Sequence, residues 1–195
     1  MTQAGFWERG YVLAENLLNA EHIAFVRSAM DASRRTGAMH RTKGGTVPVA
    51  ALNQYAPLGG EAMLLQCRSA IEAIVGRELL PAYAFWRIYE HGAALGRHVD
   101  RNSCEVSATI AVASEPLDAD WPIMVEGLDG TSAALVLRPG DAAIYLGCQV
   151  PHWRDPLSGA SQLQLFLHYV VKDGPNAGLA FDGRTKLRLG IEPEG

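Results

Sequence analysis

The sequence predicts an α+β fold in which helices come first and an antiparallel β-sandwich or barrel follows. Three observations support it. Apolar residues recur at helical spacing in the first third of the chain. From Pro81 onward, short β-prone segments alternate with turn residues. No helical pattern separates those segments, which is typical of antiparallel sheets. At 195 residues, 48% of them apolar, the chain is long enough to bury a core.

We expect a single domain over residues 1–195 with three parts. Residues 1–80 form a helical N-terminal support, and residues 81–171 form the β-core. Residues 172–195 form a tail rich in Gly, Pro and Asn, which we expect to be mostly irregular.

Two helices are expected in the support. The first follows Asn19 as N-cap, carries apolar residues such as Val26 at helical spacing, and ends at Gly37. The second covers residues 61–75, where an apolar stripe precedes Gly76. The Gly- and Pro-rich residues 38–59 between them read as a loop with a short strand around TVPVAAL, and such a loop is a plausible lid.

The β-core is expected to contain about six strands. Their sequences are rich in aromatic and β-branched residues, and turn-forming stretches such as GLDG and RPGD separate them. The expected strands are AYAFWRIYE, EVSATIAVA, WPIMVEG, SAALVLR, DAAIYLG and QLQLFLHYVV.

Charge and cysteine content exclude several function classes. A net charge of -4 without a basic run does not indicate nucleic-acid binding. The three cysteines are far apart and form no CxxC pair, which favours a reducing compartment and argues against a cysteine zinc site. No signal-like segment and no membrane-length apolar run is evident. We therefore expect a cytoplasmic protein without a membrane or nucleic-acid partner.

The stretch GRHVDRNS carries the first chemical signal. Residues two apart in a strand share a face, so His98 and Asp100 can present an imidazole and a carboxylate side by side. His152 lies 54 residues later, after a turn and a strand that can fold back toward the first pair. Alternatively, His98 and Asp100 are a solvated turn pair and His152 is an isolated loop histidine.

Two histidines and one carboxylate on one face of a metal leave the opposite face open. This ligand set is typical of non-haem Fe(II) oxygenases, whose open positions take O₂ and an organic cosubstrate. A zinc site would need a fourth ligand or a hydrolytic water, and no HExxH motif supports it.

The segment RIYEHGAALGRHVD resembles the strand and loop of Fe(II)/2-oxoglutarate-dependent dioxygenases, particularly those similar to prolyl hydroxylases. Those enzymes carry the pattern R-Y-x-x-G-x-x-Y-x-x-H-x-D, and here Tyr89 and Gly92 precede His98 at the matching spacing. The PGDAAIY stretch is similar to the family's strand before the distal histidine. The resemblance covers about residues 86–170.

The resemblance implies a double-stranded β-helix, or jelly-roll, with N-terminal supporting helices. It also implies Fe(II) bound by His98, Asp100 and His152, 2-oxoglutarate as a cosubstrate that is oxidatively decarboxylated, and O₂ as the oxidant. The implied reaction is hydroxylation of a C–H bond in a small metabolite, an amino acid or a protein residue. A carboxylate at Asp100 favours hydroxylation over halogenation, because halogenases in the family carry a small residue there.

Two departures from the family pattern matter. Leu95 replaces the second tyrosine, and Gln162 stands where the family usually places an Arg or Lys for the far carboxylate of 2-oxoglutarate. A carboxylate buried without a cation is costly. Arg154 is the first candidate for that cation, because it shares a strand face with His152 and its planar fork suits a carboxylate. Arg87 is the second candidate, and Tyr89 and Gln164 are expected to add neutral hydrogen bonds.

Other interpretations stay open at this stage. Arg154 can equally pair with a surface acid such as Asp155, and Tyr89 can be a core residue. We expect His168 to be a hydrogen-bonded interior histidine and Arg101 and Asn102 to be candidates for the substrate mouth. The uncharged Gln162 supports a rival function, a non-catalytic jelly-roll that binds a metal or a ligand. A cupin-type dioxygenase or isomerase that uses no 2-oxoglutarate is weaker, because it prefers more histidine ligands.

Overall fold

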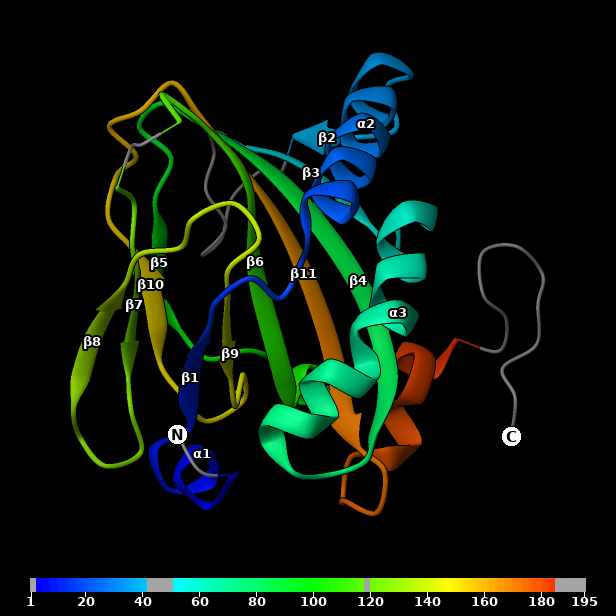
Figure 1. Ribbon diagram of the computed structural model, residues 1–195, viewed down its shortest axis with the longest axis vertical. Helices are drawn as coiled ribbons and strands as arrows, with labels where there is room; N and C mark the ends of the chain where they lie inside the picture. Colours follow the sequence, from blue (N-terminus) through cyan, green and yellow to red (C-terminus); the bar gives the residue numbers. More distant parts are fainter. Residues whose placement is uncertain (1–2, 42–50, 118–119, 185–195) are drawn as a thin grey trace.

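Two antiparallel sheets form the body of the protein (Figure 1). The computed structural model describes residues 3–41, 51–117 and 120–184. The major sheet has seven strands in the order β1 (Tyr11–Ala14), β9 (Ala142–Tyr145), β6 (Val106–Glu115), β11 (Ser161–Val171), β4 (Leu79–Glu90), β3 (Ala51–Tyr55) and β2 (His40–Arg41). The minor sheet has four, in the order β5 (Leu95–His98), β10 (His152–Arg154), β7 (Ile123–Glu126) and β8 (Ser132–Leu135). This arrangement confirms the expected α+β double-stranded β-helix.

The two long helices, α2 (Ala20–Arg35) and α3 (Leu58–Val75), cover the outer face of the major sheet (Figure 1). As predicted, the Asn19 side chain caps α2 by accepting a hydrogen bond from the backbone N–H of His22 at 2.9 Å. Gly76 ends α3 in the left-handed conformation, with φ 71°. A short helix, α1 (Gln3–Arg9), precedes β1.

Helix α3 begins at Leu58, three residues before the expected start at Glu61. We expected its two glycines to belong to the preceding loop, but they lie in the first turn of the helix. The reason is packing, since a Cβ atom at Gly60 would lie 3.0 Å from the Ala84 Cβ on β4. The glycine therefore lets the helix approach the sheet closely.

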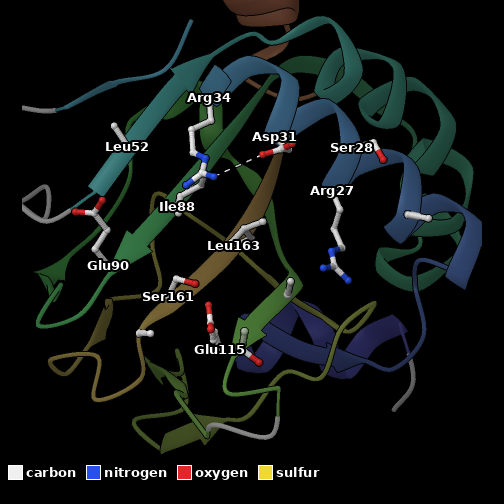
Figure 2. Close-up of a pocket in the computed structure, with 14 residues that line it drawn as sticks. Arg27, Ser28, Asp31, Arg34, Leu52, Ile88, Glu90, Glu115, Ser161 and Leu163 are labelled. Atoms are coloured by element: carbon white, nitrogen blue, oxygen red, sulfur yellow. Dashed lines mark ion pairs between the residues drawn. The ribbon is translucent and has the colours of Figure 1, made fainter. Parts of the chain in front are cut away.

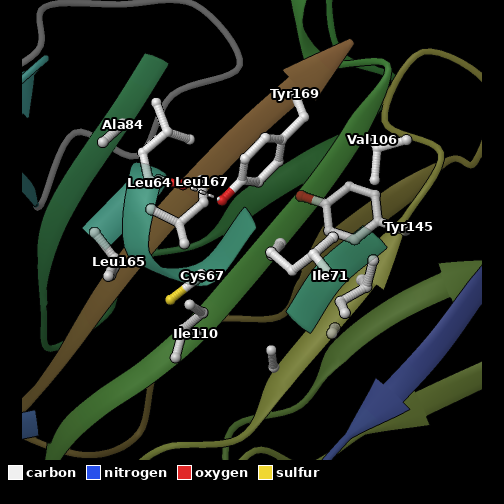
Figure 3. Packing of buried hydrophobic residues seen from close by; sticks show 14 of the residues in the cluster. Leu64, Cys67, Ile71, Ala84, Val106, Ile110, Tyr145, Leu165, Leu167 and Tyr169 are labelled. Carbon is white, nitrogen blue, oxygen red and sulfur yellow. Dashed lines mark hydrogen bonds between the residues drawn. The ribbon is translucent and has the colours of Figure 1, made fainter. Parts of the chain in front are cut away.

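The main core lies between α3 and the major sheet (Figure 3). The helix contributes Leu64, Cys67 and Ile71 to this core. The strands of the sheet contribute Ala84, Ile110, Leu165, Leu167 and Tyr169. The Tyr169 hydroxyl donates a 2.7 Å hydrogen bond to the Leu64 carbonyl oxygen, which satisfies its buried polar end. Because side chains alternate along a strand, the other residues of β4 and β11 face the interior between the two sheets.

The N-terminal third is less helical than expected. Residues Tyr11–Ala14 form β1, which pairs antiparallel with β9, and β2 and β3 extend the far edge of the major sheet. These strands are short and their partners lie far away in the sequence, so local periodicity did not reveal them. Residues 42–50 of the expected lid (residues 38–59) lie outside the described residues, as does most of the strand expected around TVPVAAL.

The described part of the segment after β11 ends at residue 184. It contains the 3-10 segment η2 (Ala177–Gly183), and a second short 3-10 turn, η1 (Asn102–Cys104), follows β5. Arg101 pairs with both carboxylate oxygens of Asp182 at 2.6 and 2.8 Å, which ties the two segments together. In the part of the chain that the structure describes, no helix is both long and apolar enough to cross a membrane.

Candidate metal centre

The three predicted metal ligands meet at one point between the sheets. Antiparallel pairing of β5 and β10 places His98 directly opposite His152, with ring centroids 4.3 Å apart. The Nε2 atoms of His98 and His152 lie 3.5 and 3.7 Å from Oδ1 of Asp100. Candidate ligand atoms from all three side chains lie within 4.8 Å of one another. The fold thus brings together residues that are 54 positions apart.

Backbone carbonyls orient both imidazole rings. His98 Nδ1 lies 2.8 Å from the Gly96 carbonyl oxygen, and His152 Nδ1 lies 3.0 Å from that of Val150. A carbonyl oxygen can only accept, so each Nδ1 carries the hydrogen and each Nε2 keeps its lone pair. In the neutral form of each ring, the Nε2 lone pair is therefore available to a metal ion held beside Oδ1 of Asp100.

The loop that carries Asp100 is also fixed. Its backbone N–H donates a 2.8 Å hydrogen bond to the Gly147 carbonyl oxygen, and its Oδ2 accepts a 3.4 Å hydrogen bond from the Ser107 hydroxyl. A Cβ at Gly147 would come within 2.3 Å of the Cys104 carbonyl oxygen, so this close approach requires glycine. Oδ1 is left facing the two histidines.

The electrostatics of the cluster suit a cation. Burial is the largest influence on the pKa of Asp100 and acts to raise it, but the His98 hydrogen bond and the charges of the nearby histidines together lower it. The Asp100 hydrogen bond raises the pKa of His98, whereas burial lowers the pKa of His152. Two imidazoles and one carboxylate with fixed tautomers form a ligand set that fits a divalent transition metal such as Fe(II).

A cavity of about 200 Å³ adjoins the three ligands, and Arg154 and Arg87 line it. Arg154 is only 2% exposed, and its Nη1 donates a 2.6 Å hydrogen bond to the Trp121 carbonyl oxygen. Its Nη2 is buried and has no hydrogen-bond partner among the described residues. Burial lowers the pKa of Arg154 to about 10, so the guanidinium stays charged at neutral pH. The alternative pairing with a surface acid is not seen within the described part of the chain.

Arg87 is 9% exposed and lines the same cavity from β4. Its Nε donates to Oδ1 of Asn53, and its Nη1 donates a 3.1 Å hydrogen bond to the Tyr89 hydroxyl. Tyr89 is fully buried against Trp121, with ring centroids 4.8 Å apart, and it does not line the cavity. Tyr89 therefore helps to hold Arg87 in place by accepting this hydrogen bond from outside the cavity lining.

The two glutamines are buried with unsatisfied atoms. Gln164 lies opposite Arg87 in the β-ladder and accepts a 3.1 Å hydrogen bond from Thr109, while its Nε2 has no partner among the described residues. Gln162 lies opposite Tyr89, and its Oε1 likewise lacks a partner in the described chain. Neither glutamine lines the cavity.

Sequence reasoning missed the aromatic side of the cavity. Tyr83 and Phe85 from β4, Tyr145 from β9, and Phe166 from β11 all line it. The signal was present, because Phe85 shares strand parity with Arg87 on AYAFWRIYE. The cavity's other ring, His168, is the hydrogen-bonded interior histidine expected: its Nδ1 lies 2.9 Å from the Ser107 hydroxyl.

Neither residue expected at the substrate mouth lines the cavity. The Arg101 guanidinium lies 4.6 Å from the Tyr83 ring centroid and is engaged by Asp182. Asn102 is exposed. Arg101 therefore packs against the outside of the cavity wall formed by Tyr83. The sequence did not indicate its ion pair with Asp182, because 81 residues separate Arg101 from Asp182.

A larger groove of about 800 Å³ lies on the opposite face of the major sheet, against α2 (Figure 2). Arg27, Arg34 and Asp31 line it from the helix, with Glu90 and Glu115 from the strands. Neither of the two candidate metal-binding clusters among the described residues includes a residue of this groove. The candidate metal ligands suggested by the sequence therefore lie at the interior cavity and not in this groove.

No protein-family model matches the chain, and no curated protein matches its sequence significantly. Solved structures do match. A prolyl-4-hydroxylase from Pseudomonas putida has a TM-score of 0.64 and 19% identity, covering 86% of this chain and 95% of its own. The epimerase SnoN from nogalamycin biosynthesis, in complex with Fe3+, alpha ketoglutarate and nogalamycin RO, has a TM-score of 0.73 and 16% identity, covering 99% and 94%.

HygX from Streptomyces hygroscopicus, with nickel, 2-oxoglutarate and hygromycin B bound, has a TM-score of 0.66 and 10% identity, covering 87% of this chain and 86% of its own. Identities this low establish the fold. The chain therefore shares the double-stranded β-helix fold of the iron- and 2-oxoglutarate-dependent oxygenases.

Proposed function

We propose that the protein is an Fe(II)/2-oxoglutarate-dependent oxygenase that hydroxylates a C–H bond of a small-molecule or peptidyl substrate. The observation that carries this proposal is the meeting of His98, Asp100 and His152 around one point beside a cavity. The neighbours with bound iron or nickel and 2-oxoglutarate support the same ligand chemistry. The three free cysteines support a reducing, cytoplasmic location.

His98 Nε2, His152 Nε2 and one Asp100 oxygen would hold the metal. When bound, iron(II) together with 2-oxoglutarate supplies the activation of O₂. The carbonyl oxygens of Gly96 and Val150 keep the imidazoles in the tautomer that can bind a metal. Asp100 fills the carboxylate position, which supports hydroxylation rather than halogenation.

Arg154 would bind the far carboxylate of 2-oxoglutarate. Its charge is buried, its Nη2 has no hydrogen-bond partner in the described part of the chain, and it stands two residues beyond His152 on the same strand. Trp121 fixes the guanidinium by accepting a hydrogen bond and by lying beneath it, with the Arg154 Cζ 4.5 Å from the ring centroid. This placement would compensate for the missing cation at Gln162.

Arg87, Tyr89 and Gln164 would form the second layer of this pocket. Tyr89 holds Arg87 through its hydroxyl, and Gln164 lies across the β-ladder from Arg87. The Nε2 of Gln164 has no partner among the described residues, so it could donate a hydrogen bond to an anionic ligand or an ordered water.

The test is anaerobic addition of Fe(II) and then 2-oxoglutarate to the metal-free protein. We expect a weak visible charge-transfer band that needs both components, and release of succinate when air is admitted. His98→Ala should remove both signals, whereas the matched variant His40→Ala, an exposed histidine on β2, should keep them.

A protein that binds iron but gives neither the band nor succinate would instead be the non-catalytic binding module. The uncharged, unsatisfied Gln162 is the observation that favours this second candidate.

A further inference from the structure

Two half-buried aromatic rings form part of the cavity wall. Phe85 on β4 and Phe166 on β11 lie directly opposite each other in the β-ladder, with ring centroids 6.0 Å apart and planes at 64°. Both line the cavity beside the metal ligands. The wall continues through His168, whose ring lies nearly parallel to Phe166, and Tyr83, whose centroid is 4.5 Å from that of His168. Apolar rings exposed in a cavity indicate a surface for a flat ligand group.

Arg87 lies beside this wall. Its Cζ is 5.2 Å from the Phe85 ring centroid and 5.8 Å from that of Phe166. Its hydrogen bonds among the described residues go to neutral groups, the Asn53 amide oxygen and the Tyr89 hydroxyl. Within that same part of the chain, no carboxylate lies within ion-pair distance of it. A guanidinium has five N–H donors, so it retains capacity for a carboxylate.

The charges that line the cavity do not balance. The two arginines, Arg87 and Arg154, outnumber the single carboxylate, Asp100, so one positive charge remains. Under the proposed function, a divalent metal and the 2-oxoglutarate dianion cancel each other and leave that excess unchanged. An uncompensated buried charge is costly. Because Arg154 would be engaged by 2-oxoglutarate, Arg87 would be the cavity arginine without an anionic partner among the described residues.

We infer that the substrate is a small acid that carries an aromatic ring and one carboxylate, with the ring against Phe85 and Phe166 and the carboxylate at Arg87. This inference rests on the proposed function for its charge balance. The cavity of about 200 Å³ is small beside sites for drug-sized ligands, which favours a compact acid.

The test measures binding by calorimetry to protein loaded with nickel(II) and saturating 2-oxoglutarate, so that Arg154 is already occupied. The probes are benzoate, phenylacetate and 3-phenylpropanoate, each compared with its uncharged amide and with its cyclohexyl counterpart. At least one aromatic acid should bind. Its amide should bind at least about tenfold more weakly, because the charged hydrogen bond to Arg87 is lost. The cyclohexyl acid should bind about twofold to tenfold more weakly.

Matched variants assign the contacts. With 2-oxoglutarate held at saturation for each variant, Arg87→Gln should weaken binding of the acid at least about tenfold, whereas Arg27→Gln, an exposed arginine on α2, should leave binding of the acid unchanged. Phe85→Leu and Phe166→Leu should each weaken the acid about twofold to tenfold, and Phe25→Leu, 49% exposed on α2, should not.

The outcomes distinguish a failure of the substrate inference from a failure of the proposed function. If nickel and 2-oxoglutarate bind but no aromatic acid does, or if acid and amide bind equally, the inference is overturned and the proposed function stands. Binding of the acid that is insensitive to Arg87→Gln also overturns it. If neither nickel nor 2-oxoglutarate binds, the proposed function fails and the inference fails with it.

Discussion

The two faces of strands β4 and β11 differ in how their charged side chains are paired and exposed. On the outer face, toward α2, Glu90 pairs with Arg41 at 2.7 Å and Asp31 pairs with Arg35 at 2.6 Å, and all four side chains are well exposed. On the inner face, Arg87 is buried among neutral partners. The outer groove is the larger hollow, but Asp31, Arg34 and Glu90 are ion-paired there, and Arg27 and Glu115 are exposed to solvent. A buried cation that lacks an anionic partner among the described residues is the better guide to a ligand site.

The largest effect should come from a proposed metal ligand beside the inner cavity. His152→Ala should weaken Fe(II) or nickel(II) binding by more than about 100-fold, because even residues that only orient metal ligands typically account for 10- to 100-fold. Equilibrium dialysis with metal analysis measures this. Arg34→Gln in the outer groove serves as the control, and a metal affinity unchanged by His152→Ala would place the metal elsewhere.

Arg154→Gln tests the cation next to the triad. We expect 2-oxoglutarate to bind about 2 kcal/mol or more weaker, roughly 30-fold, because the buried carboxylate loses its charged partner. Metal binding should be nearly unchanged. The control is Arg97→Gln, an exposed arginine on β5 that pairs with Glu126. If 2-oxoglutarate binds Arg154→Gln as tightly as the unaltered protein, another residue holds the far carboxylate.

His168 should make the interior sensitive to pH. Burial lowers the pKa of His168 to about 4 from its ordinary 6.5. The unfolded chain therefore binds a proton more readily between these values, so folding stability is lost as the pH falls through this window. From pH 7 to pH 5 this residue should cost about 2 kcal/mol of unfolding free energy.

Urea unfolding at both pH values, with and without His168→Asn, measures that contribution. The variant should show a pH dependence about 2 kcal/mol smaller. Equal pH dependence in the two proteins would mean that His168 is not held neutral by burial.

The smallest effect should come from the outer face. Asp31→Asn removes the ion pairs of α2 with Arg34 and Arg35, which are exposed and spaced by three and four residues. We expect the unfolding free energy to change by less than about 0.5 kcal/mol, since exposed pairs contribute little. Metal and 2-oxoglutarate binding should not change. A large loss of binding would show that the outer face influences the ligand site, which would contradict the difference between the two faces described above.

The parts of the fold that sequence reasoning predicted are those encoded locally. The Asn19 cap, the Gly76 stop and the strand with Arg87 all follow from short patterns. The meeting of His98 with His152 was predicted as well, because the flanking motifs resemble a known family. The parts that were missed depend on long-range pairing, such as β1 with β9 and Arg101 with Asp182. The partner of such a segment lies too far along the chain for local periodicity to indicate it.

The candidate site was likewise predicted only in part. Residue types and spacing predicted the three candidate metal ligands and the two arginines that line the cavity. The ring wall was missed because Phe85 and Phe166 resemble ordinary core residues until the β-ladder pairs them beside the cavity. The start of α3 was misplaced because Gly60 was read as a loop residue, whereas it permits close contact with Ala84.

The most direct test of the central claim is a crystal structure of the protein soaked anaerobically with Fe(II) and 2-oxoglutarate. We predict one metal ion bound by His98 Nε2, His152 Nε2 and an Asp100 oxygen, with the far carboxylate of 2-oxoglutarate at Arg154. A metal bound away from these three side chains, or a far carboxylate bound away from Arg154, would contradict the account.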